Sequence, residues 1–204
     1  MEKLDYAPNP DLAEALEELS LELSNTGQPW LVGGSCGLWL QGVKLQTAPR
    51  DIDVYADLED TVHLHEVLLP RSMDKQILDK SGMYVSLLSH YRLGSYVLEL
   101  VGGFEVRSGG SCYQVEVGEL LYKHALRVRL KERDIRLMPL SHEFLFNVLR
   151  DRPDRYKPIA ETINASPESH RGLLREMIGR NRWSKDHLQL ISDCLDWRTD
   201  TDGI

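Results

Sequence analysis

Two carboxylates stand one residue apart in the run "DIDV", residues 51–54. The run alternates polar and apolar residues, which is typical of a half-buried β-strand. Side chains at positions i and i+2 of a strand share a face, so we expect Asp51 and Asp53 side by side. Carboxylates held this close repel each other, and Mg²⁺ prefers such oxygen ligands. The spacing therefore predicts a magnesium site that could hold two ions.

A glycine-rich turn lies shortly before these carboxylates, in "LVGGS", residues 31–35. Glycines let backbone N–H groups approach phosphate oxygens, and a serine hydroxyl adds a further donor. The turn has neither the P-loop pattern nor the dinucleotide fingerprint. Alone, this turn or the carboxylate pair would be a common structural feature. Together they predict a nucleotide-phosphate and metal site, with Gly33, Gly34 and Ser35 holding the phosphates.

The stretch "WLVGGSCGLWLQGVKLQTAPRDIDVYA", residues 30–56, resembles the nucleotidyltransferase superfamily, most closely its small bacterial minimal and antibiotic-modifying members. The resemblance implies Mg²⁺-dependent transfer of a nucleoside monophosphate from an NTP to an acceptor hydroxyl, with release of pyrophosphate. It also implies a third catalytic, metal-binding carboxylate on a later strand. Glu99 in "SYVLELV" is our candidate, and Glu105 and Glu116 are alternatives.

Positive charge for the nucleotide is expected from Arg50, Arg150 and Lys157, with Arg152 and Arg155 in the same basic segment. The sequence does not identify the acceptor, which could be a small molecule, a tRNA or a protein.

The similarity weakens after the carboxylate segment. Asn147 stands where small members of the superfamily carry a lysine. An alternative hypothesis is therefore a non-catalytic nucleotide-binding or partner-binding module on the same fold, such as a toxin–antitoxin component.

Periodic apolar patterns, separated by helix-cap and turn residues, predict an α+β fold with a mixed β-sheet. A leucine stripe predicts a helix between Asn9 and Gly27, with Asn9 as its cap. Strand-like runs fill the middle of the chain, where the "GG" at 102–103 predicts a turn between two strands. Four helical stretches follow residue 140. We therefore expect a nucleotidyltransferase-like domain at 1–140 and a C-terminal helical region at 141–204 packed on it.

Other expected helix caps are Asp57, Ser166 and Ser184.

Composition restricts the class of protein further. The net charge of −8 over 204 residues argues against general binding of duplex nucleic acid, although residues 121–185 carry 15 Lys and Arg against 8 Asp and Glu. The three cysteines form no CxxC pair, so we expect a reducing, cytoplasmic location. No apolar run approaches the roughly 18 residues of a membrane span, and the N-terminus lacks a signal-peptide pattern.

Overall fold

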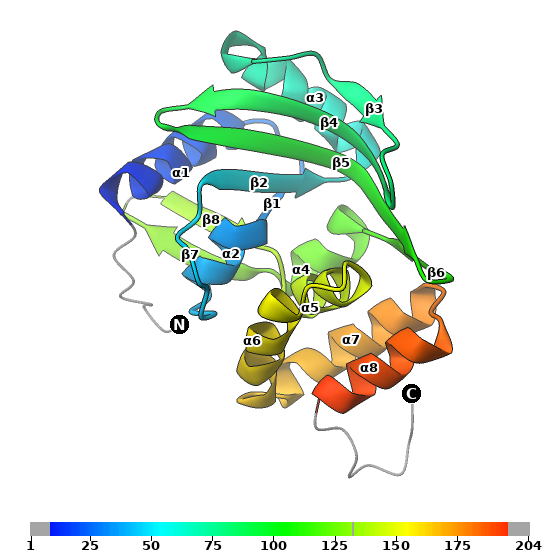
Figure 1. Ribbon diagram of the computed structural model, residues 1–204. Helices are drawn as coiled ribbons and strands as arrows, with labels where there is room; N and C mark the ends of the chain where they lie inside the picture. Colours follow the sequence, from blue (N-terminus) through cyan, green and yellow to red (C-terminus); the bar gives the residue numbers. More distant parts are fainter. Residues whose placement is uncertain (1–8, 132, 196–204) are drawn as a thin grey trace.

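One mixed β-sheet organises residues 9–131 and 133–195, which are the residues that this computed structural model describes (Figure 1). Over these residues the sheet has eight strands in the order β3-β4-β5-β2-β1-β8-β7, and β6 pairs with β5. The β2–β5 and β1–β8 pairs are parallel, and the other pairs are antiparallel. The strands are β1 (Leu31–Gly33), β2 (Asp51–Ala56), β3 (Ile77–Asp79), β4 (Tyr84–Leu93), β5 (Tyr96–Ser108), β6 (Ser111–Gln114), β7 (Leu126–Leu130) and β8 (Arg133–Leu137). The predicted α+β fold with a mixed sheet is confirmed.

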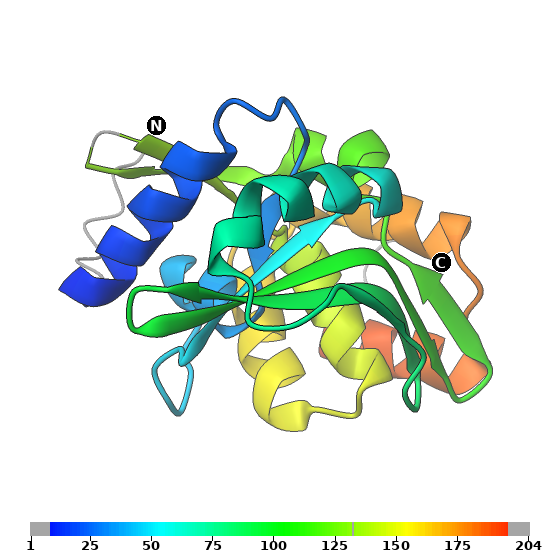
Figure 2. The ribbon, with the colours of Figure 1, turned by 90° about the horizontal axis from the view of Figure 1, so that it is seen from above.

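Helices cover both faces of this sheet (Figure 2). On one face, α1 and α3 pack through Leu16 and Leu64 in a buried cluster that also contains Ile52 of β2. The predicted leucine stripe of α1 is buried, since Leu12, Leu16, Leu19 and Leu23 are each at most 1% exposed. The helices are α1 (Pro10–Leu23), α2 (Gly34–Leu40), α3 (Leu58–Leu68), α4 (Tyr122–His124), α5 (Leu140–Leu149), α6 (Pro153–Asn164), α7 (Glu168–Arg180) and α8 (Lys185–Cys194), with short helical turns at Leu69–Arg71 and Val117–Leu121.

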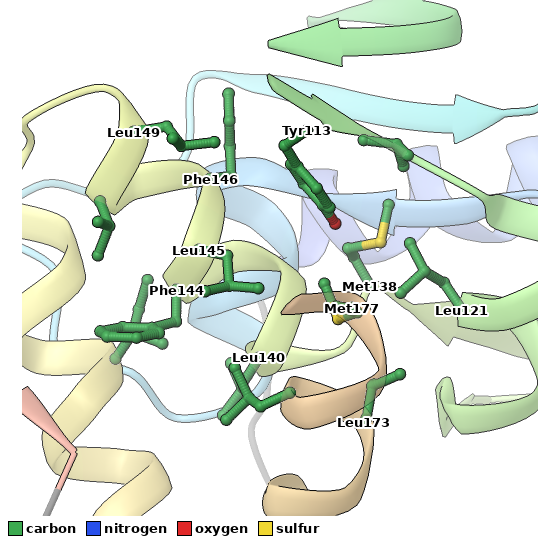
Figure 3. Close-up of a cluster of buried hydrophobic side chains, with 14 of the residues drawn as sticks. Tyr113, Leu121, Met138, Leu140, Phe144, Leu145, Phe146, Leu149, Leu173 and Met177 are labelled. Atoms are coloured by element: carbon green, nitrogen blue, oxygen red, sulfur yellow. The ribbon is translucent and has the colours of Figure 1, made fainter. Parts of the chain in front are cut away.

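The fifth helix, α5, is buried along its whole length. Figure 3 shows its side chains Phe144, Leu145 and Phe146 beside Met177 of α7 and Tyr113 of β6. One cluster thus joins the sheet to the C-terminal helices. Because α5 belongs to that shared core, the division of the chain at residue 140 stays a prediction.

The predicted turn at residues 102–103 is wrong, because β5 runs through both glycines. A Cβ atom on Gly102 would lie 2.2 Å from Oγ1 of Thr61, so the missing side chain lets α3 approach the sheet. Gly103 has φ +55°, which bends the strand. The short strand β3 has no counterpart among the predicted elements.

Two predicted caps are confirmed and two differ. The Asn9 side chain accepts a hydrogen bond from the Asp11 N–H, and Ser184 accepts one from the His187 N–H. Asp57 stands at the start of α3, but its carboxylate accepts hydrogen bonds from the N–H groups of residues 117 and 118 instead. Ser166 is not the cap of α7, which begins at Glu168 after Pro167.

Among the described residues, no helix has both the length and the apolar character needed to cross a membrane.

Candidate active site

Three carboxylates line one cavity where β2 and β5 run side by side. Asp53 is the register partner of Glu99 across this parallel pair, and Asp51 stands two residues before Asp53 on the same strand face. All three side chains line one cavity of about 380 Å³. The alternative glutamates do not line it: Glu105 pairs with Arg107, and Glu116 pairs with Arg180.

Burial and nearby negative charge disfavour the charged forms of Asp53 and Glu99. Burial is the main cause that raises the pKa of Asp53 to about 7, and the neighbouring Asp51 and Glu99 raise it further. Arg150 and Arg155 oppose this shift. Burial also raises the pKa of Glu99, against the opposing effect of His90. A bound cation would relieve the repulsion among the three groups.

The donor set suits a hard cation. Within residues 9–131 and 133–195, no three His, Cys, Asp or Glu side chains already converge as a complete metal site. However, Mg²⁺ commonly takes only one or two carboxylates and fills its remaining positions with water and substrate phosphates. Asp51, Asp53 and Glu99 supply only oxygen donors in one cavity, and their repulsion raises the pKa of Asp53. These residues therefore fit Mg²⁺.

The glycine-rich turn leads from β1 into α2 beside these carboxylates. Gly34 and Ser35 line the cavity, whereas Gly33 does not. Gly34 has φ +57°, and a Cβ atom there would lie 1.9 Å from Oδ2 of Asp53, so only glycine fits. The Gly34 N–H donates to Oε1 of Glu143 at 2.7 Å. One amide that we expected to serve phosphate is thus already bonded to a carboxylate.

Glu143 was not among the predicted site residues. It lies in the first turn of α5, lines the cavity, and is 1% exposed. Burial raises its pKa to about 8, although the hydrogen bond from Gly34 opposes the shift. The sequence signal was a single acidic residue in the mostly apolar helix "LSHEFLFNVL".

Three arginines bring positive charge to the same cavity: Arg150, Arg152 and Arg155, from the end of α5 to the first turns of α6. The Arg150 guanidinium lies 4.7 Å from the ring centroid of Phe146, and Arg152 is bonded twice to Asp154. Of the five basic residues from which we expected positive charge for a nucleotide, Arg150, Arg152 and Arg155 line the cavity.

Arg50 and Lys157 are exposed and do not line the cavity. Lys157 lies two positions after Arg155 in α6, so it points away from the helix face that carries Arg155.

A histidine extends the carboxylate row by one strand. His90 of β4 is the register partner of Glu99, and its Nε2 lies 3.8 Å from Oε1 of Glu99. Asp74 fixes this histidine twice: one carboxylate oxygen accepts the His90 backbone N–H at 2.8 Å, and the other lies 2.5 Å from Nδ1. This pair, also absent from our prediction, orients an imidazole toward Glu99.

Aromatic rings complete the cavity. Tyr84, Phe104 and Phe146 lie in mutual contact and line it. Faces of such rings can support a planar base. The Asn147 side chain also lines the cavity, but its amide donates to the backbone oxygen of Glu143 at 2.7 Å. The cavity therefore combines an acidic side, a basic side and an apolar surface.

The sequence matches no family model and no curated protein sequence. Solved structures do match it. A candidate nucleotidyltransferase from Thermotoga maritima aligns with a TM-score of 0.62 at 18% identity, covering 79% of this chain and 98% of that one. The solution structure of the antibiotic-resistance factor ANT(2'')-Ia aligns with a TM-score of 0.50 at 11% identity, covering 83% and 92%. The chain has the nucleotidyltransferase fold.

Proposed function

We propose that the protein transfers a nucleoside monophosphate from an NTP to an acceptor hydroxyl and releases pyrophosphate, in a Mg²⁺-dependent reaction. The observation that carries this proposal is one cavity lined by three carboxylates, Asp51, Asp53 and Glu99, and by three arginines of the α5–α6 segment. Carboxylates that hold a cation and arginines that bind phosphate are the two complementary requirements of a nucleoside triphosphate.

Each group has a role in this proposal. Asp51, Asp53 and Glu99 would hold Mg²⁺, whose chemistry when bound is to neutralise phosphate charge and polarise the reacting phosphoryl group. Arg150 and Arg155 offset the remaining negative charge of the triphosphate. The Ser35 hydroxyl lines the cavity and is available as a donor to a phosphate oxygen.

The reaction exchanges one phosphorus–oxygen bond for another. The acceptor oxygen bonds to the α-phosphorus, and the bond from that phosphorus to the bridging oxygen breaks. The bridging oxygen leaves with the electron pair as part of pyrophosphate. The acceptor proton passes to the Glu99 carboxylate, which lines the cavity beside Asp53.

The second candidate function is nucleotide or partner binding without turnover. Two contacts favour it: the Gly34 N–H is bonded to Glu143, and the Asn147 amide is turned into its own helix. A cavity arranged in this way can retain a ligand while lacking a donor that turnover requires.

Pyrophosphate release separates the two candidates. Each of the four NTPs is offered with Mg²⁺ and with acceptors of three classes: small hydroxylated molecules, tRNA and protein. Wild type is compared with Asp51→Asn and with the control Glu105→Gln, which changes a strand glutamate outside the cavity.

We expect wild type and Glu105→Gln to release pyrophosphate with one acceptor class. The rate of pyrophosphate release by Asp51→Asn should fall at least about 100-fold. Mutation of residues that only orient metal ligands already lowers metal affinity or activity by about 10- to 100-fold. Equal release by wild type and Asp51→Asn would contradict the proposal. Metal-dependent NTP binding without release for any acceptor class would favour the binding module.

A further inference from the structure

A second cavity of about 330 Å³ lies at the opposite edge of the sheet from β3. It is formed by the end of α1, the segment 24–30, α4 and the β7–β8 hairpin, and Figures 1 and 2 both show α1 beside that hairpin. Its lining shares no residue with the carboxylate cavity among the residues that the structure describes. It is therefore a separate candidate site.

Two arginines face this second cavity together. Arg127 and Arg136 are register partners on β7 and β8, so their side chains share a face, where like charges repel. Arg136 donates to the Tyr122 backbone oxygen at 3.3 Å. Arg127 makes no hydrogen bond or ion pair with any residue in 9–131 or 133–195. Most of the guanidinium donors are thus free to bind an anion.

The remaining charge at this second cavity does not neutralise the two arginines. Asp134 is the acidic residue in its described lining, and its carboxylate is paired with Arg129 at 3.1 Å. Residues 122–137 carry six Lys and Arg against two Asp and Glu, in a chain whose net charge is −8. The β7–β8 side of the cavity is therefore basic, and none of the five acidic residues of α1 lines the cavity from the other side. The two arginines thus make the β7–β8 side suited to an anionic ligand.

Aromatic and neutral polar groups complete the lining. Trp30 and Tyr122 both line the cavity, and the Arg136 guanidinium lies 4.2 Å from the Tyr122 ring centroid. Ser24 and Gln28 add hydrogen-bonding groups. Guanidinium groups that bind phosphate and aromatic faces that stack on a planar base are together the chemistry of nucleotide recognition. The volume is at the lower end of the range for small-molecule sites, about 300–1,000 Å³.

We propose that this second cavity binds a phosphorylated nucleoside, with Arg127 and Arg136 on the phosphate and with Trp30 and Tyr122 against the base. The ligand is either a free nucleotide or the phosphorylated terminal nucleotide of an RNA strand. This proposal does not depend on activity at the carboxylate cavity.

Isothermal titration calorimetry with the full chain tests the proposal. The probes are the four nucleoside 5′-monophosphates, 5′-phosphorylated RNA tetranucleotides, adenosine and inorganic phosphate, all in EDTA. Variants are Arg127→Ala, Arg127→Lys, and the control Arg133→Ala, which removes an arginine of the same hairpin outside the cavity. Arg127 is exposed, so its substitution should leave folding intact, and thermal melts check this.

We expect binding of a phosphorylated nucleoside that weakens at least about 10-fold in Arg127→Ala, partly recovers in Arg127→Lys and is unchanged in Arg133→Ala. Tighter binding of the monophosphate identifies a free nucleotide, and tighter binding of the tetranucleotide identifies an RNA end. The proposal is overturned if neither binds, if inorganic phosphate or adenosine binds as tightly as the preferred monophosphate, or if Arg133→Ala weakens binding as much as Arg127→Ala.

Discussion

Asp53 is the residue where burial and charge repulsion act together. Its pKa of about 7, against an ordinary value of 3.8, means that the folded protein retains a proton that the unfolded chain releases. The stability from that proton is present at low pH and is lost as pH rises through about 7. In the absence of Mg²⁺, we therefore expect the free energy of unfolding to fall between about pH 4 and 7.

Asp53→Asn should make that pH dependence shallower, because the amide does not ionise. Urea unfolding at a series of pH values in EDTA measures the effect. Asp154→Asn is the control, because Asp154 is an exposed carboxylate that Arg152 already keeps at a lowered pKa. An Asp53→Asn curve as steep as that of wild type would show that Asp53 ionises normally in the folded protein.

Glu143 supports a separate prediction, because it accepts a hydrogen bond from Gly34 of the glycine-rich turn. Glu143→Gln keeps an oxygen that can accept the Gly34 N–H but removes the charge that appears as pH approaches the raised pKa of about 8. At pH 8.5 we expect this variant to bind Mg²⁺–NTP a few-fold more tightly than wild type, because one negative charge leaves the cavity. Calorimetry measures the ratio.

Glu143→Ala provides the contrast, because it removes the acceptor of the Gly34 N–H as well as the charge. If Glu143→Gln weakened binding as much as Glu143→Ala, the charge would not be what opposes the nucleotide.

At the scale of elements, the turn between β1 and α2 must bring the chain against β2 without a side chain in the way. Gly34→Ala places a Cβ atom 1.9 Å from Oδ2 of Asp53 and adds a left-handed backbone penalty at φ +57°. Gly42→Ala is a matched control, because Gly42 has φ +77° with no atom within 4 Å of the added Cβ. In both variants the left-handed backbone conformation should lower the free energy of unfolding by about 1–2 kcal/mol.

Only Gly34→Ala should lose stability beyond that backbone cost and also lose Mg²⁺–NTP binding. Denaturant unfolding and calorimetry on the two variants separate the effects. Equal losses of stability, with nucleotide binding retained in both, would show that the close approach of Gly34 to Asp53 is unimportant.

Sequence periodicity predicted which segments form helices and strands better than it predicted which strands pair and in what register. The spacing of Asp51 and Asp53 sufficed to predict a shared strand face, because that relation is local. The alignment of Asp53 with Glu99 depends on the register of two strands whose partners are 46 positions apart, which no local pattern determines. The glycines at 102–103 misled for a related reason: Gly102 lies against Thr61 and Gly103 against Leu58, both contacts between distant segments.

Position along and around α6 explains which of the basic residues reach the cavity. Arg152 and Arg155 are three positions apart and reach the cavity, while Lys157 does not. The sequence showed all of these residues but not which of them would face the cavity. The sequence did not predict Glu143 as a site residue, because its hydrogen-bond partner Gly34 is 109 positions away.

At the scale of the whole molecule, α5 ties the sheet to the last helices. Leu145 is 0% exposed within the cluster that both parts share. We expect Leu145→Ala to lower the free energy of unfolding by about 2–5 kcal/mol while unfolding stays a single transition. Circular dichroism and tryptophan fluorescence should give coincident urea curves.

Leu21→Ala, which truncates a side chain that is 52% exposed, should change stability little. Two separate transitions in Leu145→Ala would instead show that the sheet and the C-terminal helices unfold independently.

Calorimetric titration of each NTP into the protein, with and without Mg²⁺, measures whether Asp51 and Asp53 bind a metal–nucleotide complex. Wild type is compared with Asp51→Asn/Asp53→Asn and with Glu105→Gln. We expect micromolar, Mg²⁺-dependent binding of at least one NTP by wild type and Glu105→Gln, and its loss in the double variant. Absence of binding by wild type, or equal binding by the double variant, would contradict it.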